Sequence, residues 1–534
     1  MAEETVVFAR KASGLVREMS PLDVLLLVIA GPAASGMTYY AVKQPGIYPG
    51  GNMPLAFLIG GLLWLFPVIL IAVYASSFPR SGAMYVVISR ATHPLIGFLP
   101  MWLWIVSAGM TAGFFCYIGL NLISASLQVG GYVAGSSGMV SAGDWLGGDI
   151  TRLWIGLILA VIVWGLQLMG LDRLKWFIRG VIILPLIITI IVLIGMFVMD
   201  GNAAFNEVFG AGTVEKIKAA AEAQGIGDAM MSGGQALGGM LLAVFWAYTA
   251  LEATSFIGSE VKSPRTSFMR GMGLGFTLVV IIYVLNAWGP VVSFGGDLIR
   301  DYSWLYNTSN ETYAALQEAM GGITPPIVSM PMYAGIVFQS AWLAIIFGIG
   351  YFCWYINTAL ICWLGGVRGL FAMAFDRQLP LWLCNVSKRG IPQNATHVIA
   401  IVALASVFLG YADAQGAGLA GIVLAALDFT ALFFIWTVGL AGIFLPYIRP
   451  DMFEKSTFQY KIAGIPWMTI LGVITLGIGW WAMFMVGVEL ATTWSQIITA
   501  IVIVIGFVLV AIMYDRNRKE GIDPNQIFAS IPPA

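Results

Sequence analysis

Long runs of apolar residues separated by short polar segments dominate the chain. About twelve runs reach the roughly 20 residues that an α-helix needs to cross a bilayer. They lie near 21–42, 53–75, 95–126, 150–170, 174–199, 236–258, 272–295, 330–365, 394–412, 417–446, 466–487 and 493–514. The run 330–365 is too long for one helix, so we expect part of it to belong to the preceding loop. The pattern predicts an all-α polytopic membrane protein.

Two of these runs, at matching places in the chain, contain residues that interrupt a membrane helix. Residues 25–40 read LLLVIAGPAASGMTYY, and residues 243–260 read AVFWAYTALEATSFIGSE, with Glu252 inside the run. Glycine, proline and a carboxylate at bilayer depth are tolerated where the chain lines a cavity for a polar solute. The pair of broken spans therefore predicts a transporter.

Composition agrees with the hydrophobic pattern. Of 534 residues, 59% are hydrophobic and 10% are charged, which excludes an ordinary soluble globular protein. Residues 1–20 lack the apolar core and cleavage site of a secretory signal, so we expect the first span to remain in the mature protein. The chain has no phosphate-binding P-loop motif, and neither a cofactor nor a nucleic-acid partner is expected.

Lysine and arginine predict the orientation. If the N-terminus is cytoplasmic, 21 of the 26 basic residues lie on that side. The other side holds Lys43, Arg152, Lys216, Lys218 and Arg300. Because cytoplasmic loops of membrane proteins carry the excess of basic residues, we expect both termini to be cytoplasmic in a cell membrane.

The spans group into two units of five, each of which begins with a broken span. An odd number of spans per unit inverts the second unit relative to the first, the arrangement that permits alternating access. The predicted ranges are the tail 1–20, the first unit 21–199, the outer loop 200–235, the second unit 236–446 with its outer loop 296–326, the final hairpin 447–514 and the tail 515–534. Asn307 and Asn310 begin glycosylation-type sequons in the second loop, and their modification stays open.

Four motifs in the cytoplasmic loops point to one family. They read FPRSGAMY at 78–85, SEVKSP at 259–264, RGLFAMAFDRQLP at 368–380 and VSKRGIP at 386–392. In this order they resemble the amino acid, polyamine and organocation (APC) superfamily permeases of the amino acid permease type, over about residues 20–465. The resemblance implies a leucine-transporter-like fold of five plus five inverted spans, in which broken spans 1 and 6 hold the substrate's carboxylate and amino groups.

In the first break, the family's Gly-Ser-Gly segment best matches Ala34, Ser35 and Gly36. Ser35 and Gly36 would offer N–H groups to a carboxylate, as half-helix N-termini do. The departure from the pattern is Ala34 in place of the first glycine, with Gly31 one turn earlier. A kinked packing face of small residues is the alternative.

In the second break, Trp246, Tyr248 and Thr249 resemble the aromatic-rich segment of the family. Trp246 would cover the aliphatic part of the substrate, and carbonyl groups near Trp246 and Thr249 would accept from its ammonium. Packing or interfacial anchoring is the alternative for a tryptophan in a membrane chain.

Glu252 is the candidate for proton coupling, because an ionisable residue within a span is costly and by default marks a pathway or a proton relay. A structural hydrogen bond and a counter-charge for a cationic substrate are the alternatives. Asp428 is a second acid within a span, for which we favour a structural role. Sodium coupling would need oxygen ligands, and Asn357 and Thr358 are candidates.

We therefore expect a secondary active transporter, a symporter that imports neutral or hydrophobic amino acids with protons. Transport of cationic amino acids or polyamines, sodium coupling, exchange, and a non-transporting nutrient sensor stay open as alternatives. An enzyme is not expected, because HExxH and GxSxG motifs are absent, and no catalytic or metal-binding residues are proposed. Residues 107–112 show no feature that indicates a specific substrate contact. The four cysteines, Cys362 among them, are expected to be small core residues.

Overall fold

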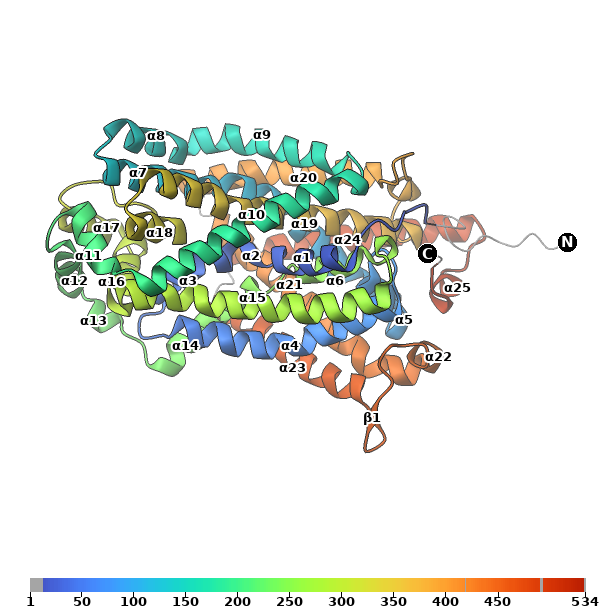
Figure 1. The fold of residues 1–534 in the computed structure, drawn as a ribbon. Helices are drawn as coiled ribbons and strands as arrows, with labels where there is room; N and C mark the ends of the chain where they lie inside the picture. The colour runs from blue at the N-terminus through green and yellow to red at the C-terminus, as the bar shows by residue number, and fades with distance from the viewer. Residues whose placement is uncertain (1–12, 418, 490–492, 533–534) are drawn as a thin grey trace.

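The computed structural model describes residues 13–417, 419–489 and 493–532 as a bundle of long helices that run side by side (Figure 1). Within these residues, eleven helical segments are long and apolar enough to cross a membrane, and the short apolar helix α1 (Pro21–Ala30) accompanies them. The spanning helices are α4 (Met53–Ser77), α6 (Pro94–Ile118) with α7 (Leu120–Ala134), α9 (Asp149–Gln167), α10 (Leu171–Val198), α14 (Gly233–Ala247), α15 (Pro264–Phe294), α19 (Ala341–Phe375), α20 (Gln393–Ala412), α21 (Leu419–Ile448), α23 (Trp467–Glu489) and α24 (Thr493–Lys519). The predicted all-α polytopic fold class is confirmed.

The first span is broken, as the sequence predicts. It starts at α1, where Ser20 and Asp23 form a reciprocal capping box and Pro21 occupies the first helical position. After Gly31 and Pro32 the chain resumes as α2 (Ala33–Ser35), the π-helical η1 (Gly36–Tyr40) and α3 (Ala41–Ile47). A proline has no N–H for the helical ladder, which explains the interruption at this point.

The sixth span is broken between α14 and two 3₁₀ segments, η2 (Leu251–Phe256) and η3 (Gly258–Glu260). At the break Ala250 adopts a left-handed backbone conformation with φ of 70°. Such a conformation is unfavourable for a residue with a Cβ, so the surrounding packing must hold it in place. Span 1 and span 6 denote these two broken segments below.

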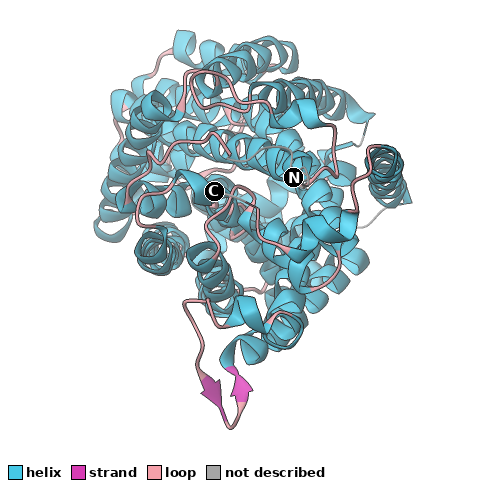
Figure 2. Cartoon of the chain, turned by 90° about the vertical axis from the view of Figure 1, so that its right-hand side faces the viewer, coloured by secondary structure: helices cyan, strands magenta, loops and turns pink. Residues whose placement is uncertain are grey.

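The two ends of the bundle differ. The end that carries both described chain ends, called the terminal end, has α5 (Ala83–Ala91), η4 (Leu381–Cys384), α22 (Pro450–Phe453), α25 (Pro524–Ala529) and the hairpin of β1 (Lys461–Ile462) and β2 (Ile465–Pro466) (Figure 2). The opposite end, called the loop end, has α8 (Ser137–Gly147), α11 (Gly201–Phe209), α12 (Thr213–Ala223), α13 (Ile226–Ala229), α16 (Gly296–Asn307), α17 (Asn310–Ala319) and α18 (Met330–Phe338). The long run 330–365 is thus divided between α18, which lies with the loop-end helices, and α19.

Candidate substrate-binding site

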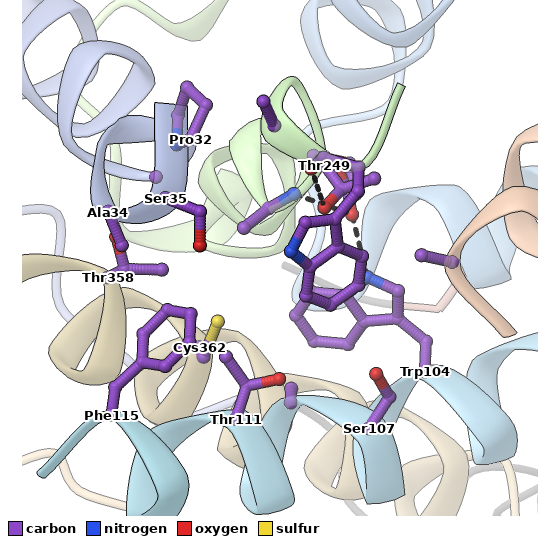
Figure 3. A pocket seen from close by; sticks show the side chains of 17 residues that line it. Pro32, Ala34, Ser35, Trp104, Ser107, Thr111, Phe115, Thr249, Thr358 and Cys362 are labelled. Carbon is purple, nitrogen blue, oxygen red and sulfur yellow. Dashed lines mark hydrogen bonds between the residues drawn. The ribbon is translucent and has the colours of Figure 1, made fainter. Parts of the chain in front are cut away.

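A cavity lies where the two breaks face each other (Figure 3). Its empty volume, counted up to the surrounding solvent, is about 440 Å³. The lining comes from five spans and consists of Gly31, Pro32, Ala34, Ser35, Trp104, Ser107, Ala108, Thr111, Phe115, Trp246, Ala247, Thr249, Ala250, Glu252, Thr358, Cys362 and Ala431. Glu252 is the one charged side chain among them.

The two breaks are held together through their backbones. Gly31 lies against Ala250, and a Cβ added at Gly31 would approach the carbonyl oxygen of Ala250 to 2.7 Å. The hydroxyl of Tyr283, on α15, hydrogen-bonds the carbonyl of Pro32 in span 1 and lies 2.9 Å from the carbonyl oxygen of Ala247 in span 6. One side chain therefore bridges both breaks.

The ends of the half-helices give the cavity opposite polarity on two sides. The second half of span 1 begins at Ala33, so the N–H groups of its first turn lack helical partners and carry the positive end of a helix dipole. The first half of span 6 ends at Ala247, and its last carbonyls face the break. The carbonyl of Trp246 accepts from the N–H of Thr249 at 2.9 Å and from its hydroxyl at 2.7 Å.

Glu252 is fully buried, yet only one of its carboxylate oxygens is paired. Oε1 accepts from the indole N–H of Trp104 at 2.7 Å and from the backbone N–H of Ala250 at 3.1 Å (Figure 3). Oε2 has no hydrogen-bond partner among the described residues. Because a buried carboxylate oxygen without a partner is costly, this atom is placed to take a proton or a donor from a ligand.

One wall of the cavity comes from a face of α6 that sequence reasoning missed. Trp104, Ser107, Thr111 and Phe115 follow one another at helical spacing and all line the cavity. The hydroxyls of Ser107 and Thr111 have no hydrogen-bond partner among the described residues. Figure 3 shows both side chains directed into the cavity. Cys362, expected as a core residue, also lines it. A hydroxyl or thiol on a membrane helix gives no signal that separates a packing face from a cavity wall.

Seven of the residues proposed from the sequence line this cavity, namely Gly31, Ala34, Ser35, Trp246, Thr249, Glu252 and Thr358. Two others fulfil packing roles nearby. Gly36 lies against the ring of Tyr283, which a Cβ would approach to 2.3 Å. Tyr248 is fully buried, and its hydroxyl donates to the backbone carbonyl of Phe57 at 2.8 Å. The rings of Tyr248 and Phe57 also pack edge to face.

The sodium-site candidates hydrogen-bond to different helices. The hydroxyl of Thr358 donates to the carbonyl of Ala30, at the end of α1, at 3.1 Å. Asn357 does not line the cavity, and its side-chain N–H₂ donates to the carbonyl of Val181 on α10. Its Oδ1 has no partner among the described residues. The side chain of Asp428 lies outside the described residues.

Two buried ion pairs lie toward the terminal end of the bundle. Arg368 holds Glu260 through two hydrogen bonds of 2.8 and 3.0 Å, and both side chains are at most 5% exposed. Arg90 and Asp376 form a second bidentate ion pair, and both side chains are at most 1% exposed. The N–H groups of residues 18 and 19 both donate to the carbonyl of Glu260 at 2.9 Å, which ties the chain before α1 to the end of span 6.

Comparisons with known proteins identify the family of the chain. A family model described as "Amino acid permease" matches residues 19–508. Uncharacterized transporters of Mycobacterium tuberculosis and Mycobacterium bovis are each 23% identical over 406 residues, which are 76% of this chain and 76% of theirs. The methylthioribose transporter of Bacillus subtilis is 23% identical over 530 residues, which are 97% of each chain. Since the family match extends over nearly the whole chain, the protein belongs to the amino acid permease family and is an integral membrane transporter.

Proposed function

We propose that this transporter imports a neutral amino acid together with a proton, by alternating access around the cavity between the two breaks. The observation that carries the proposal is Glu252, whose Oε2 lies without a partner in the wall of that cavity. A buried carboxylate that changes protonation when the cavity opens to one side or the other would link substrate movement to proton movement.

The polarity of the half-helix ends supports an amino acid as the substrate. A carboxylate would accept from the first-turn N–H groups of α2, beside Ala34 and Ser35. An ammonium would donate toward the carbonyl end of α14, beside Trp246. No basic side chain and no second acid lines the cavity among the described residues, so a substrate side chain without net charge fits best.

The remaining contacts support an outward-facing conformation with a cytoplasmic terminal end. The paired arginines Arg90 and Arg368 close the terminal end, while a second, larger cavity reaches from the central one toward the loop end. Import would require these ion pairs to separate as the loop end closes. The basic residues of the sequence favour the same orientation.

Proton coupling is preferred to sodium coupling because the two candidate sodium ligands do not hydrogen-bond toward one point. Thr358 bonds to α1 and Asn357 bonds to α10. Glu252 as a counter-charge would instead favour a cationic amino acid or a polyamine, so both belong in the substrate panel.

The test is uptake of labelled solutes into proteoliposomes under a pH gradient, a sodium gradient or neither. The proposal expects a neutral amino acid to accumulate with the pH gradient alone. Glu252→Gln should keep substrate binding and abolish proton-driven accumulation, while Glu222→Gln, at an exposed position on α12, should behave as the parent chain. Uptake that follows sodium and survives Glu252→Gln would refute the coupling role. Binding of amino acids without flux would indicate a nutrient sensor.

A second candidate substrate is methylthioribose, which the named relative of Bacillus subtilis transports. This sugar has no carboxylate and no ammonium, and its hydroxyl groups could bond Ser107 and Thr111, whose hydroxyls face the cavity without partners. The relative aligns along 97% of the chain, although at 23% identity. Including methylthioribose in the uptake panel separates the two candidates, because Ser107→Ala with Thr111→Val should abolish sugar uptake and spare that of an apolar amino acid.

A further inference from the structure

The larger cavity toward the loop end, called the vestibule below, adjoins the central cavity. Its empty volume is about 1040 Å³, and it shares Ser35, Phe115 and Trp246 with the central cavity. Its other lining residues come mainly from η1 and α3, from α6, α7 and α9, and from α16, α19 and η5 (Asp413–Ala417). The vestibule therefore adjoins the central cavity on its loop-end side, at Trp246.

Aromatic rings form much of the vestibule wall. Tyr355 meets Tyr39 edge-on with ring centroids 6.0 Å apart and meets Phe115 at 4.7 Å. Tyr306, on α16, lines the vestibule as well. Rings fixed against one another in this way offer apolar faces to the flat or aliphatic body of a ligand.

Lys43 contributes a positive charge without an ion-pair partner to this aromatic chamber, whose lining also includes Arg152 and the carboxylate of Asp413. The residue lines the vestibule and is half-buried, and its backbone is fixed because the carbonyl of Lys43 accepts from the hydroxyl of Ser303 at 2.7 Å. Its ammonium has no hydrogen bond and no ion pair among the described residues. A charge withdrawn from water without a partner is costly, and a bound anion would remove that cost.

Two arginines near the loop end are paired, unlike Lys43, whereas Lys216 and Lys218 on α12 have no ion pair among the described residues. Arg300 pairs with Asp297 at 3.1 Å and with Asp301 at 2.8 Å. Arg152 pairs with Asp149, and its guanidinium lies 4.5 Å from the centre of the Tyr117 ring. Of the two basic side chains that line the vestibule, Lys43 is therefore the one without an ion pair among the described residues.

Further donors line the same chamber without partners. The Nε of Arg152 and the hydroxyl of Tyr117 are buried and have no hydrogen-bond partner among the described residues. Tyr117 is 2% exposed. Both groups donate hydrogen bonds, as a carboxylate requires, and they come from α6 and α9, whereas Lys43 comes from span 1.

We propose that the vestibule is a second ligand site, separate from the central cavity, for a molecule that combines a carboxylate with an aromatic or apolar body. Lys43 is its ionic partner, Arg152 and Tyr117 are the neighbouring donors, and the rings of Tyr39, Tyr306 and Tyr355 contact its body. The site does not depend on what the central cavity transports, because its charge and its wall come mostly from other residues.

Equilibrium binding to the full-length protein in detergent micelles tests the site, with phenylacetate as the probe. Phenylacetamide has the same shape without the charge, and phenethylamine carries the opposite charge. Titration calorimetry should show saturable binding of phenylacetate, binding of phenylacetamide weaker by about tenfold or more, and no binding of phenethylamine; tenfold corresponds to about 1.4 kcal/mol, the size expected for one charged contact.

Variants then locate the probe. Lys43→Gln should weaken phenylacetate binding by about tenfold, whereas Lys43→Arg should restore most of it because the charge is kept. Lys218→Gln on α12 and Thr111→Val in the central cavity should leave the affinity unchanged. Each variant is first checked for an unchanged melting temperature.

Equal binding of phenylacetate and phenylacetamide would overturn the proposal, and so would parental affinity in Lys43→Gln. If Thr111→Val weakens phenylacetate binding while Lys43→Gln does not, the probe occupies the central cavity and the vestibule site is wrong. None of these outcomes bears on proton-driven uptake, so the failure of this site and the failure of the proposed function are distinguishable.

Discussion

Gly31 in span 1 lies so close to the carbonyl oxygen of Ala250 in span 6 that a Cβ at position 31 would come within 2.7 Å of it. The carbonyl belongs to a residue whose backbone is itself held in a left-handed conformation. The contact is between two backbones, so neither side can yield by a rotamer change. It fixes the separation of the two breaks and with it the width of the cavity between them.

Gly31→Ala should therefore impair transport more than it impairs membrane insertion. Moving backbone atoms apart to admit the methyl group costs about 1–3 kcal/mol. If transport requires the two breaks to lie this close together, that cost corresponds to a loss of uptake of about fivefold to 150-fold. The measurement is the initial rate of uptake in proteoliposomes at matched protein content. Gly238→Ala is the matched control, because a Cβ at Gly238, on α14 of span 6, meets no atom within 4 Å. Equal rates in the two variants would contradict the expectation.

Tyr283→Phe should loosen both breaks at once. The substitution keeps the ring but removes the hydroxyl that bridges the carbonyls of Pro32 and Ala247. Leaving buried acceptors unpaired costs about 1–3 kcal/mol, so the melting temperature in detergent should fall. Tyr333→Phe is the control, because the hydroxyl of Tyr333 is buried and has no partner among the described residues. That variant should melt at the parental temperature or above it, and a larger loss in Tyr333→Phe than in Tyr283→Phe would refute the bridging role.

The fold and the breaks could be predicted because they follow from chemistry that the sequence displays directly. Apolar runs of spanning length have few alternatives in a bilayer, and Pro32 and Glu252 do not suit a continuous membrane helix. The order of the four loop motifs then indicated the family. None of these inferences required knowledge of which side chains face one another.

The cavity wall contributed by α6 could not be predicted, because its identification requires knowing which side chains face one another. Ser107 and Thr111 are typical of any membrane helix that packs closely against another, and nothing local tells whether a cavity lies beside them. The sequence also could not tell which of the neighbours Asn357 and Thr358 faces the cavity. Side chains at adjacent positions on a helix point about 100° apart. Thr358 lines the cavity and Asn357 does not. Only the packing of distant spans decides such cases.

Cys362 should be the thiol through which a small reagent inhibits transport. Both Cys362 and Cys116 are buried, but Cys362 lines the central cavity, whereas Cys116 lines neither that cavity nor the vestibule. Treatment with aminoethyl methanethiosulfonate should therefore reduce uptake by filling the cavity, and saturating substrate should slow the loss. Cys362→Ala should be resistant, and Cys116→Ala should remain sensitive. Inhibition that persists in Cys362→Ala would show that the reagent acts at another cysteine.

Arg368→Gln should be strongly destabilising, because it leaves the carboxylate of Glu260 charged and buried without its partner. Removing one partner of a buried ion pair costs about 3–5 kcal/mol, since the remaining charge is withdrawn from water without compensation. The melting temperature in detergent micelles should therefore fall sharply. The double variant Glu260→Gln with Arg368→Gln should recover much of the loss, because two neutral amides can bond to each other.

Lys519→Gln is the matched control for this pair, because Lys519 and Asp515 form an exposed ion pair with side chains 75% and 66% exposed. Exposed pairs contribute about 0–1 kcal/mol, so this variant should melt close to the parental temperature. The double variant carries a second expectation. If separation of Arg368 from Glu260 accompanies opening of the terminal end, a neutral pair should open more readily, and the cavity residue Cys362 should react faster with a thiol reagent applied from that end. An unchanged rate would mean that this ion pair stabilises the fold without gating the path.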